Sequence, residues 1–385
     1  MGVLIECVIS VGVVWAIIHA WILRRWSHGW HLALSGKMPV SDEIGPLNWT
    51  VLIPARNEAH NLPQVLDDLQ KQHIQVDIVL VDDHSTDCTL DVARDHNLTR
   101  KGQMKVLTAN GEGKKSAILT GLRSINTPWL VTLDADVRLG PKWAQMWHTH
   151  LLDISDEFAC VAGPVVLTTN PDKPSLWQAV QALDYAAQMG WSVHCIAKGL
   201  PASASGANMA VRCDTYPDTR SMGPSGDDTL VIQQLQRDGH LVTWLSDSRA
   251  TVRTAGAYSL RSWMQQRTRW AGKAVHYDAR TKRTAWWMAS MAFLQWSLWL
   301  GACVSAKIEM WAFAWGWWVA ITFMNLAYVR PIAKWFGLRT TWMHGFALGL
   351  TQPAHVPLVL LAQAGLLRPF GIASKPIWKG RTCST

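Results

Sequence analysis

Four long apolar stretches constrain the fold of this 385-residue chain more than any other feature. Each is close to the roughly 20 residues that an α-helix needs to cross the hydrocarbon core of a bilayer. Within lipid, only helices and closed barrels satisfy the backbone polar groups, so these stretches predict membrane helices at both ends of the chain. They are Gly2 to Leu23, Ala285 to Ala306, Met310 to Val329 and Met343 to Leu367.

The N-terminal stretch has the pattern of a membrane anchor. A cleaved signal peptide is the alternative, but it would begin with basic residues and end at a small-residue cleavage site, and neither is found here. We expect an anchor over residues 1–24 and an interfacial linker over residues 25–47, which begins at Arg25 and contains Trp26 and Trp30.

The C-terminal region predicts about three membrane segments over residues 284–367 and a basic tail over residues 368–385. The last segment contains Gln352-Pro353-Ala354-His355-Val356-Pro357 at its middle, so a re-entrant hairpin is an alternative to a full span. Several tryptophans lie deep in the segments, where they could face a lipid or other helices: Trp296, Trp299, Trp315, Trp317 and Trp318.

The composition and charge of the chain favour a membrane surface over nucleic acid as its partner. The chain is 49% hydrophobic and only 17% charged, which fits a chain that lies partly in lipid. The net charge of +8 comes from Lys and Arg that flank the apolar segments, without an aromatic and basic RNA-binding signature. An anionic membrane surface is therefore the predicted partner, and nucleic acid is not. Seven cysteines show neither a zinc spacing nor a disulfide framework and indicate a reducing compartment.

The region between the membrane segments predicts an α/β fold. Apolar strands alternate with helices over residues 48–257, a pattern typical of a mostly parallel sheet. No G-x-G-x-x-G motif is present, which disfavours a nicotinamide oxidoreductase. The four predicted strands are Trp49–Ile53, Ile78–Val81, Met104–Thr108 and Trp129–Leu133.

Acidic residues follow two of these strands. Asp82 and Asp83 come after the second strand, and Asp134 and Asp136 follow the fourth. Alternate residues of a strand share a face, so Asp134 and Asp136 can point together beyond its carboxyl end. Two such carboxylates predict Mn²⁺ or Mg²⁺ bound together with an anion such as a nucleotide diphosphate. Asp is also common in turns and helix caps, which leaves a capping role open, especially for Asp82.

Seven short motifs over about residues 48–280 resemble, in order and spacing, those of family 2 glycosyltransferases. The resemblance implies a GT-A fold and a nucleotide-sugar donor, usually a UDP-sugar. Its membrane members include ceramide glucosyltransferases, carotenoid and hopanoid sugar transferases and the processive cellulose and hyaluronan synthases, and this short chain is most similar to the first group. The motifs are Val51 to Glu58, Val81 to Asp87, Gly113-Lys114, Asp134-Ala135-Asp136, Ser205 to Asn208, Gly226-Asp227-Asp228 and Gln266 to Trp270.

The resemblance assigns the donor site to the first motifs. Asp83 can accept the imide hydrogen of uracil, and Lys114 can meet the base or a phosphate, whereas Lys115 is expected to be a solvated neighbour. Asp134 and Asp136 are the implied metal ligands, with Mn²⁺ or Mg²⁺ compensating the charge of the leaving diphosphate. The nucleotide-sugar-binding residues are Pro54, Arg56, Glu58, Asp82, Asp83, Lys114 and Asp134.

The resemblance also implies a general base. Asp228 is the second acid of a pair that opens a helix, and Asp227 is the alternative base; both can also be read as caps. A carboxylate that takes the acceptor proton on the face opposite the leaving group gives inversion.

One helix face carries Gln266, Arg269 and Trp270. The resemblance places Trp270 against the acceptor and Arg269 against the diphosphate. It assigns Asn208 to the same acceptor and diphosphate region. Residues 258–283 also fit an interfacial amphipathic helix. His194 could touch the acceptor or be structural.

The leading hypothesis is an inverting transferase that moves a sugar from a nucleotide sugar to a hydroxyl of a membrane lipid. We expect an integral membrane enzyme with a cytoplasmic catalytic domain, since Arg330, Lys334 and Arg339 would then also be cytoplasmic. One anchor and about three segments are few for a polymer channel, which favours the transfer of a single sugar. The alternative is a small processive polysaccharide synthase that works as an oligomer. The hypothesis outside the enzymes is a membrane protein that binds a nucleotide sugar without turning it over.

Overall fold

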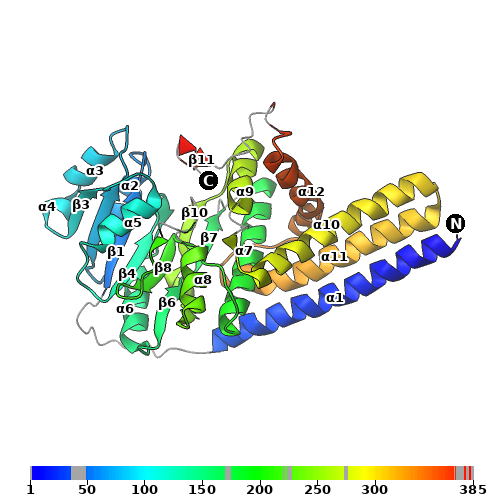
Figure 1. Cartoon of the computed structure of the whole chain (residues 1–385), viewed down its shortest axis with the longest axis horizontal. Helices are drawn as coiled ribbons and strands as arrows, with labels where there is room; N and C mark the ends of the chain where they lie inside the picture. Colours follow the sequence, from blue (N-terminus) through cyan, green and yellow to red (C-terminus); the bar gives the residue numbers. More distant parts are fainter. Residues whose placement is uncertain are drawn as a thin grey trace. The chain divides into compact units, whose positions relative to one another are not determined.

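A computed structural model of the chain (Figure 1) describes residues 2–35, 49–169, 175–219, 222, 228–272, 276–367, 369, 377–378 and 381–382. The chain divides into two compact units, each described here by itself. The helical unit comprises Met1–His31, Thr169–His194 and Gly256–Ile377, and the sheet unit comprises Leu32–Thr168, Cys195–Ala255 and Trp378–Thr385.

The sheet unit contains a seven-stranded sheet of order β3-β2-β1-β4-β8-β6-β9. The first four strands along the chain pair in parallel, β8 is antiparallel to β4 and β6, and β9 is parallel to β6. The prediction of an α/β fold with a mostly parallel sheet is confirmed. The strands are β1 (Trp49–Ala55), β2 (Asp77–Asp82), β3 (Met104–Thr108), β4 (Trp129–Leu133), β6 (Phe158–Ala162), β8 (Asn208–Arg212) and β9 (Leu241–Trp244).

A second sheet of order β5-β10-β7 belongs to the same unit. Its strands are β5 (Val137–Arg138), β7 (Val165–Thr168) and β10 (Val252–Ala255), and two further short strands are β11 (Ile377–Trp378) and β12 (Arg381–Thr382). The helices of the unit are α2 (Leu62–Gln70), α3 (Thr89–Asp95), α4 (Asn97–Arg100), α5 (Lys114–Leu122), α6 (Trp143–Asp153), α8 (Thr229–Arg237) and the 3₁₀ helix η2 (Ser248–Ala250).

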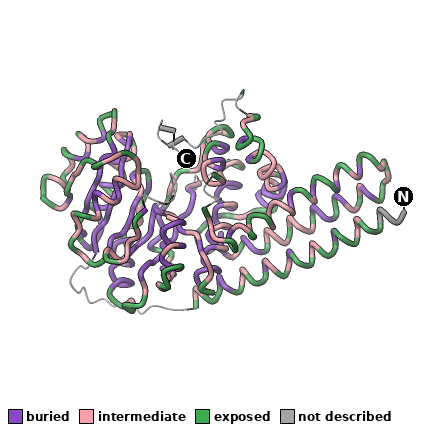
Figure 2. The backbone as a smooth tube through the Cα atoms, viewed as in Figure 1, coloured by how far each residue is buried: buried purple, intermediate pink, exposed green. Residues whose placement is uncertain are grey.

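The core of the sheet unit fixes α5 against the central strands. Ile118 of α5 and Leu52 of β1 are among the most buried side chains, and the central strands β1 and β4 are buried along their whole length (Figure 2). A side chain at Gly121 would overlap Leu52, so the helix lies unusually close to the sheet. Burying such an aliphatic side chain contributes about 1.5 to 3 kcal/mol. This packing places Lys114, the first residue of α5, where the strands end.

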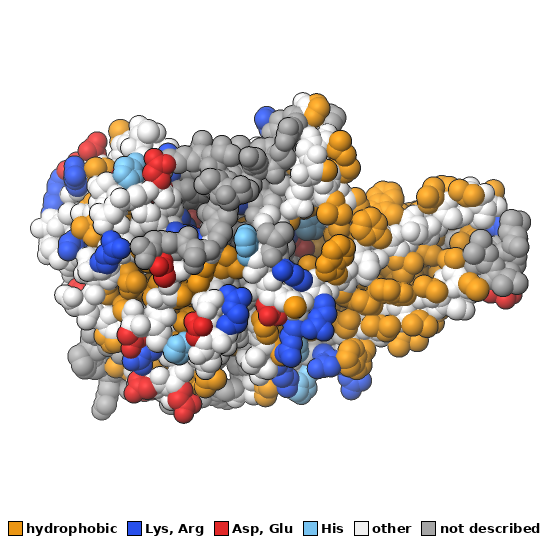
Figure 3. Space-filling view, viewed as in Figure 1, with side chains coloured by type: hydrophobic (Ala, Val, Ile, Leu, Met, Phe, Trp, Pro, Cys, Tyr) orange, Lys and Arg blue, Asp and Glu red, His pale blue; other side chains and the backbone are white. Residues whose placement is uncertain are grey.

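The helical unit holds α9 (Leu260–Gly272), α10 (Ala279–Ser305), α11 (Ile308–Trp335), α12 (Trp342–Gln363) and most of α1 (Gly2–Ser35) and of α7 (Leu176–Ala197). Within the described chain, four helices are long and apolar enough to cross a membrane: α1 from Glu6 onward, α10, α11 and α12. Figure 3 shows hydrophobic side chains covering these helices, with Lys and Arg gathered at one end of the apolar surface.

Two expected boundaries differ from the structure. The N-terminal helix continues to Ser35, through the first part of the expected linker. The prediction of one interfacial helix over residues 258–283 is wrong, because α9 ends at Gly272 and a new helix begins at Ala279. Asp278 caps that helix by accepting a hydrogen bond from the backbone of Arg280 at 2.8 Å.

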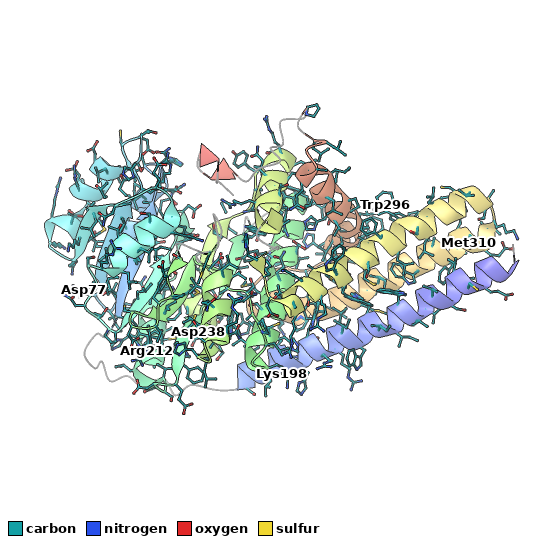
Figure 4. All side chains as sticks on the ribbon, in the orientation of Figure 1. Asp77, Lys198, Arg212, Asp238, Trp296 and Met310 are labelled. Carbon is teal, nitrogen blue, oxygen red and sulfur yellow. The ribbon has the colours of Figure 1, made fainter. Side chains whose placement is uncertain are left out.

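The C-terminal segment forms one continuous helix, α12, and not a hairpin. Pro353 has no N–H, so the carbonyl of Gly349 loses its helical partner, and the indole of Trp318 donates to it at 2.9 Å. Pro357 frees the carbonyl of Pro353 in the same way, and Trp296, labelled in Figure 4, donates to it at 2.9 Å. Two of the deep tryptophans therefore face another helix and satisfy the carbonyls that the prolines expose.

A chain of hydrogen bonds joins the four apolar helices. Trp287 of α10 donates to Nδ1 of His19 at 3.3 Å, which leaves the proton of the neutral ring on Nε2. His19 can then donate to Asn325 of α11 at 2.8 Å, and Asn325 donates to Gln352 of α12 at 2.7 Å. Polar side chains among apolar helices need such partners, and these hydrogen bonds tie α1, α10, α11 and α12 together.

His194 is buried in the helical unit. A side chain at Gly29 of α1 would overlap its ring. The close approach of α1 and α7 at this point explains the burial without an acceptor.

Candidate functional site

The carboxyl ends of β1 and β2 bring two predicted donor-site residues to one edge of the sheet. Asp82 pairs in register with Ala55, and the amide of Asp83 donates to the carbonyl of Ala55 at 2.8 Å. Asp82 is 3% exposed, its Oδ2 accepts from the amide of Ser85 at 3.2 Å, and its Oδ1 has no donor in the described part of the chain. Leaving such an acceptor unsatisfied costs about 1 to 3 kcal/mol, which a ligand N–H or O–H would offset.

Asp83 organises the loops around this edge. Its side chain is fully buried, and Oδ1 accepts from the amide of Gly113 at 2.8 Å. Gly113 has φ of +93°, a conformation that favours glycine, so this bond fixes the turn directly before Lys114. Arg56 lies against the same group: it donates to the Asp83 carbonyl at 2.7 Å, and its Nη1 is 3.9 Å from Asp83 Oδ2.

Pro54 and Glu58 are buried supports. Pro54 lies inside β1, opposite Val81 of β2, and does not end the strand as the sequence suggested. Glu58 is 5% exposed and accepts from the side chain of Asn61 at 2.8 Å. Both residues shape the turn after β1.

A cation and a carboxylate meet at the end of β4. Nζ of Lys114 lies 2.8 Å from Oδ1 of Asp134, and the two side chains are 20% and 35% exposed. Asp134 is partly exposed and Asp136 is exposed, while Ala135 between them is buried, so both acids reach solvent. The three residues lie in the turn after β4 and not in the strand, so the alternation of strand side chains that the sequence suggested does not apply to them. This is an accessible, charged edge.

The two acids fit part of a hard-metal site. Carboxylate oxygens are the ligands that Mg²⁺ and Mn²⁺ prefer, and both side chains reach solvent. Among the described residues, no group of three or more His, Cys, Asp or Glu could hold a metal ion. Asp134 and Asp136 would therefore supply only part of a coordination sphere, and an anionic ligand and water would complete it.

Lys115 is not the solvated neighbour that the sequence suggested. Its ammonium group donates to the carbonyl of Thr219 at 3.3 Å and to that of Met222. The adjacent lysines at the start of α5 thus have different partners, and Lys115 ties Thr219 and Met222 to the helix.

Asp228 lies at the start of a helix, as predicted. It is the N-cap of α8 and accepts from the amide of Thr229 at 2.6 Å. The cap holds the carboxylate at the first turn of the helix. Asp227 lies outside the described residues.

The structure contradicts the prediction that Asn208 lies at the acceptor and the diphosphate. Its side chain is fully buried, and Oδ1 accepts from the indoles of Trp143 and Trp147 at 3.1 and 2.9 Å. Nδ2 donates to the carbonyls of Pro164 and Ala250 at 2.9 and 3.1 Å. All four hydrogen-bonding positions of the amide are used, so Asn208 is structural and does not contact an acceptor or a diphosphate.

The remaining predicted residues lie on α9 in the helical unit. Gln266, Arg269 and Trp270 are partly exposed, whereas the neighbouring Arg267 is buried and forms an ion pair with Asp184 of α7. The sequence alone gave Arg267 and Asp184 no role, because the pairing joins residues 83 positions apart.

Comparisons with known proteins bear on the family and the fold of the chain. A family described as "Glycosyl transferase family group 2" matches residues 129–367, and "Glycosyl transferase family 2" matches residues 50–197. A mannosyltransferase from Pyrobaculum calidifontis, solved in complex with GDP-Man and Mn²⁺, has a similar fold: the TM-score is 0.58 at 17% identity, covering 92% of this chain and 96% of that one.

Curated relatives match a shorter stretch. The 4,4'-diaponeurosporenoate glycosyltransferase of Staphylococcus haemolyticus is 35% identical over 98 residues, which are 25% of this chain and 26% of the relative. Its Staphylococcus aureus counterpart is 33% identical over 88 residues, 23% of this chain and 24% of that protein. The chain thus covers about a quarter of the length of these relatives.

Proposed function

Because the chain belongs to glycosyl transferase family group 2 and has a GT-A fold, we propose that it transfers a sugar from a nucleotide sugar to a hydroxyl of a membrane lipid, with inversion. The Lys114–Asp134 pair at the carboxyl edge of the parallel sheet is the observation that carries this proposal. Open α/β sheets bind their ligands at that edge.

The donor lies along the ends of β1, β2 and β4. The buried Oδ1 of Asp82, which has no donor among the described residues, accepts a ring N–H or a ribose hydroxyl, and uracil offers an imide N–H that cytosine lacks. Asp83 and Arg56 support this region by holding the Gly113 turn and the end of β2. A UDP-sugar is the donor that we favour.

Lys114 changes partner when the donor binds. In the structure its ammonium group neutralises Asp134. A diphosphate offers stronger charge-assisted hydrogen bonds, so Lys114 moves to a phosphate oxygen. Asp134, released from Lys114, would then hold Mn²⁺ or Mg²⁺ together with Asp136, and the bound metal would compensate the charge on the departing diphosphate.

Asp228 is the general base. Its place at the N-terminus of α8 and the hydrogen bond that it accepts from the amide of Thr229 fix the position of the carboxylate. It takes the proton of the acceptor hydroxyl as that oxygen attacks the anomeric carbon opposite the diphosphate. The oxygen–carbon bond forms as the bond to the diphosphate breaks, so no covalent enzyme intermediate is needed.

The acceptor comes from the bilayer. Within the described chain four helices are apolar and long enough to cross it, and the curated relatives are named as 4,4'-diaponeurosporenoate glycosyltransferases. On this topology Arg24, Arg25, Arg330, Lys334 and Arg339 are cytoplasmic, as the positive-inside rule prefers, and the sheet unit is cytoplasmic with them. Gln266, Arg269 and Trp270 act toward the acceptor and the diphosphate.

A labelled-donor assay tests the proposal. Purified protein in lipid nanodiscs is incubated with radiolabelled UDP-, GDP- and other nucleotide sugars and a total lipid extract, with Mn²⁺, with Mg²⁺ or with chelator. We expect one sugar to appear on a lipid in the presence of metal only. If the label appeared in a polymer, the enzyme would be a processive synthase and not a single-sugar transferase. If no donor gave a labelled product, transferase activity would be refuted.

A further inference from the structure

One face of α7 holds the chain that leads into α9. Trp177, Gln181 and Asp184 lie at positions i, i+4 and i+7 and so share a helix face. The amide of Gln181 accepts from the backbone N–H of Ala257 and donates to its carbonyl, both at 2.9 Å. Trp177 donates to the same carbonyl at 2.9 Å. The backbone just before α9 is thereby fixed to α7.

One turn further along α7, Asp184 forms an ion pair with Arg267 of α9. The Arg267 side chain is 5% exposed, and its Nε has no partner within the described residues. A buried guanidinium needs a compensating charge, and Asp184 supplies it. Asp184 is held in turn by the amide of Gln188, which donates to its Oδ2 at 3.0 Å.

Arg267 also contacts the aromatic residues of its own helix. Its guanidinium lies 4.9 Å from the ring centre of Trp270 and 5.3 Å from that of Trp263. The ring of Tyr185, the neighbour of Asp184, lies 6.1 Å from Trp270. Trp263 in turn packs against His355 of α12 at 5.1 Å. Fixing Arg267 thus fixes both the rotation of α9 about its axis and the plane of Trp270.

We propose that Asp184 is a positioning residue: through Arg267 it sets the directions in which α9 presents Gln266, Arg269 and Trp270. The catalytic part of this inference rests on the proposed function. Asp184 does not act on the substrate itself, because its carboxylate is already committed to Arg267 and Gln188.

The test combines a kinetic and a structural readout. Asp184→Asn keeps the shape of the side chain and removes its charge. We expect its transfer kcat to fall by about a hundred-fold, since small displacements of positioning groups can have effects of that size. Backbone amides of Leu260–Gly272 should exchange hydrogen faster in the variant even without substrate. Arg267→Gln should have a similar effect, and the double variant should lose little more than either single one.

Asp247→Asn is the matched control, since it removes the carboxylate that lies 2.6 Å from Arg249 in the sheet unit. It should leave both readouts close to those of the wild type. The inference is overturned if Asp184→Asn leaves the α9 exchange unchanged, or if transfer falls only in proportion to the amount of folded protein. If the wild type transfers no sugar, the proposed function fails, while the exchange experiment still decides whether Asp184 holds α9.

Discussion

Nζ of Lys114 lies 2.8 Å from Oδ1 of Asp134, so the first residue of α5 neutralises the first acid that follows β4. Both residues are placed by buried structure, Lys114 by the packing of α5 on β1 and Asp134 by the fully buried strand before it. The pair places the ammonium group of Lys114 where we propose that the diphosphate binds.

Replacing Lys114 tests this relationship. A charge-assisted hydrogen bond contributes about 1.5 to 3 kcal/mol, so Lys114→Met should lower kcat/KM for the donor by about ten- to a hundred-fold. Lys105→Met, at an exposed position of β3, serves as the control and should leave kcat/KM unchanged. An unchanged donor kcat/KM for Lys114→Met would remove this residue from the donor site.

Asn208→Ala should affect stability and not chemistry. It leaves the indoles of Trp143 and Trp147 and the carbonyls of Pro164 and Ala250 without their buried partner. Unsatisfied buried groups cost about 1 to 3 kcal/mol each, so a loss of about 4 kcal/mol is expected. The melting temperature should fall, and the rate per folded molecule should stay near that of the wild type. A large loss of rate at normal stability would return Asn208 to the active site.

His150 predicts a pH dependence of stability. Burial in α6 lowers its pKa from 6.5 to about 4, and neither ring nitrogen has a partner in the described chain. Between pH 6.5 and 4 the unfolded state binds a proton that the folded state does not, so stability falls as the pH falls through this window. The loss amounts to about 3 kcal/mol. Thermal melts of His150→Phe should show a smaller acid sensitivity than the wild type, and equal sensitivity would contradict the assignment.

The prolines of α12 predict a pairwise coupling. Trp296→Phe removes the donor to the Pro353 carbonyl and should destabilise the bundle by about 1 kcal/mol. In a Pro357→Ala background the backbone amide of residue 357 can satisfy that carbonyl, so the same change should cost much less. Unfolding in mixed micelles measures the cycle, and additive effects would show that the indole does not replace the missing amide.

Local pattern was enough to predict the elements that build the site. β3 and β4 have the predicted bounds, because each is a short apolar run between polar or turn residues. The helix after Asp228 was predicted from the helical spacing of its apolar residues and from the acidic residues at its start. The resemblance in turn identified Lys114 and Asp134, whose proximity follows from parallel strands that end at one edge.

The roles that the sequence could not show depend on contacts between distant residues. Asn208 belongs to a motif, yet its task is set by Trp147 and Trp143, 61 and 65 positions away. Arg267 lies inside the α9 motif, but its partner Asp184 is on another helix. The prolines of α12 suggested a hairpin because the indoles that replace their missing amides are on α10 and α11. Spacing along the chain cannot report such pairings.

The central claim, that a carboxylate at the start of α8 removes the acceptor proton, is tested most directly by Asp228→Asn. The amide keeps the size of the side chain but cannot take a proton, so the rate of labelled glycolipid formation should fall by about two to four decades, with donor affinity unchanged. Asp238→Asn, an exposed position at the other end of α8 (Figure 4), should keep the wild-type rate. An Asp228→Asn protein that forms glycolipid at the wild-type rate would contradict the account.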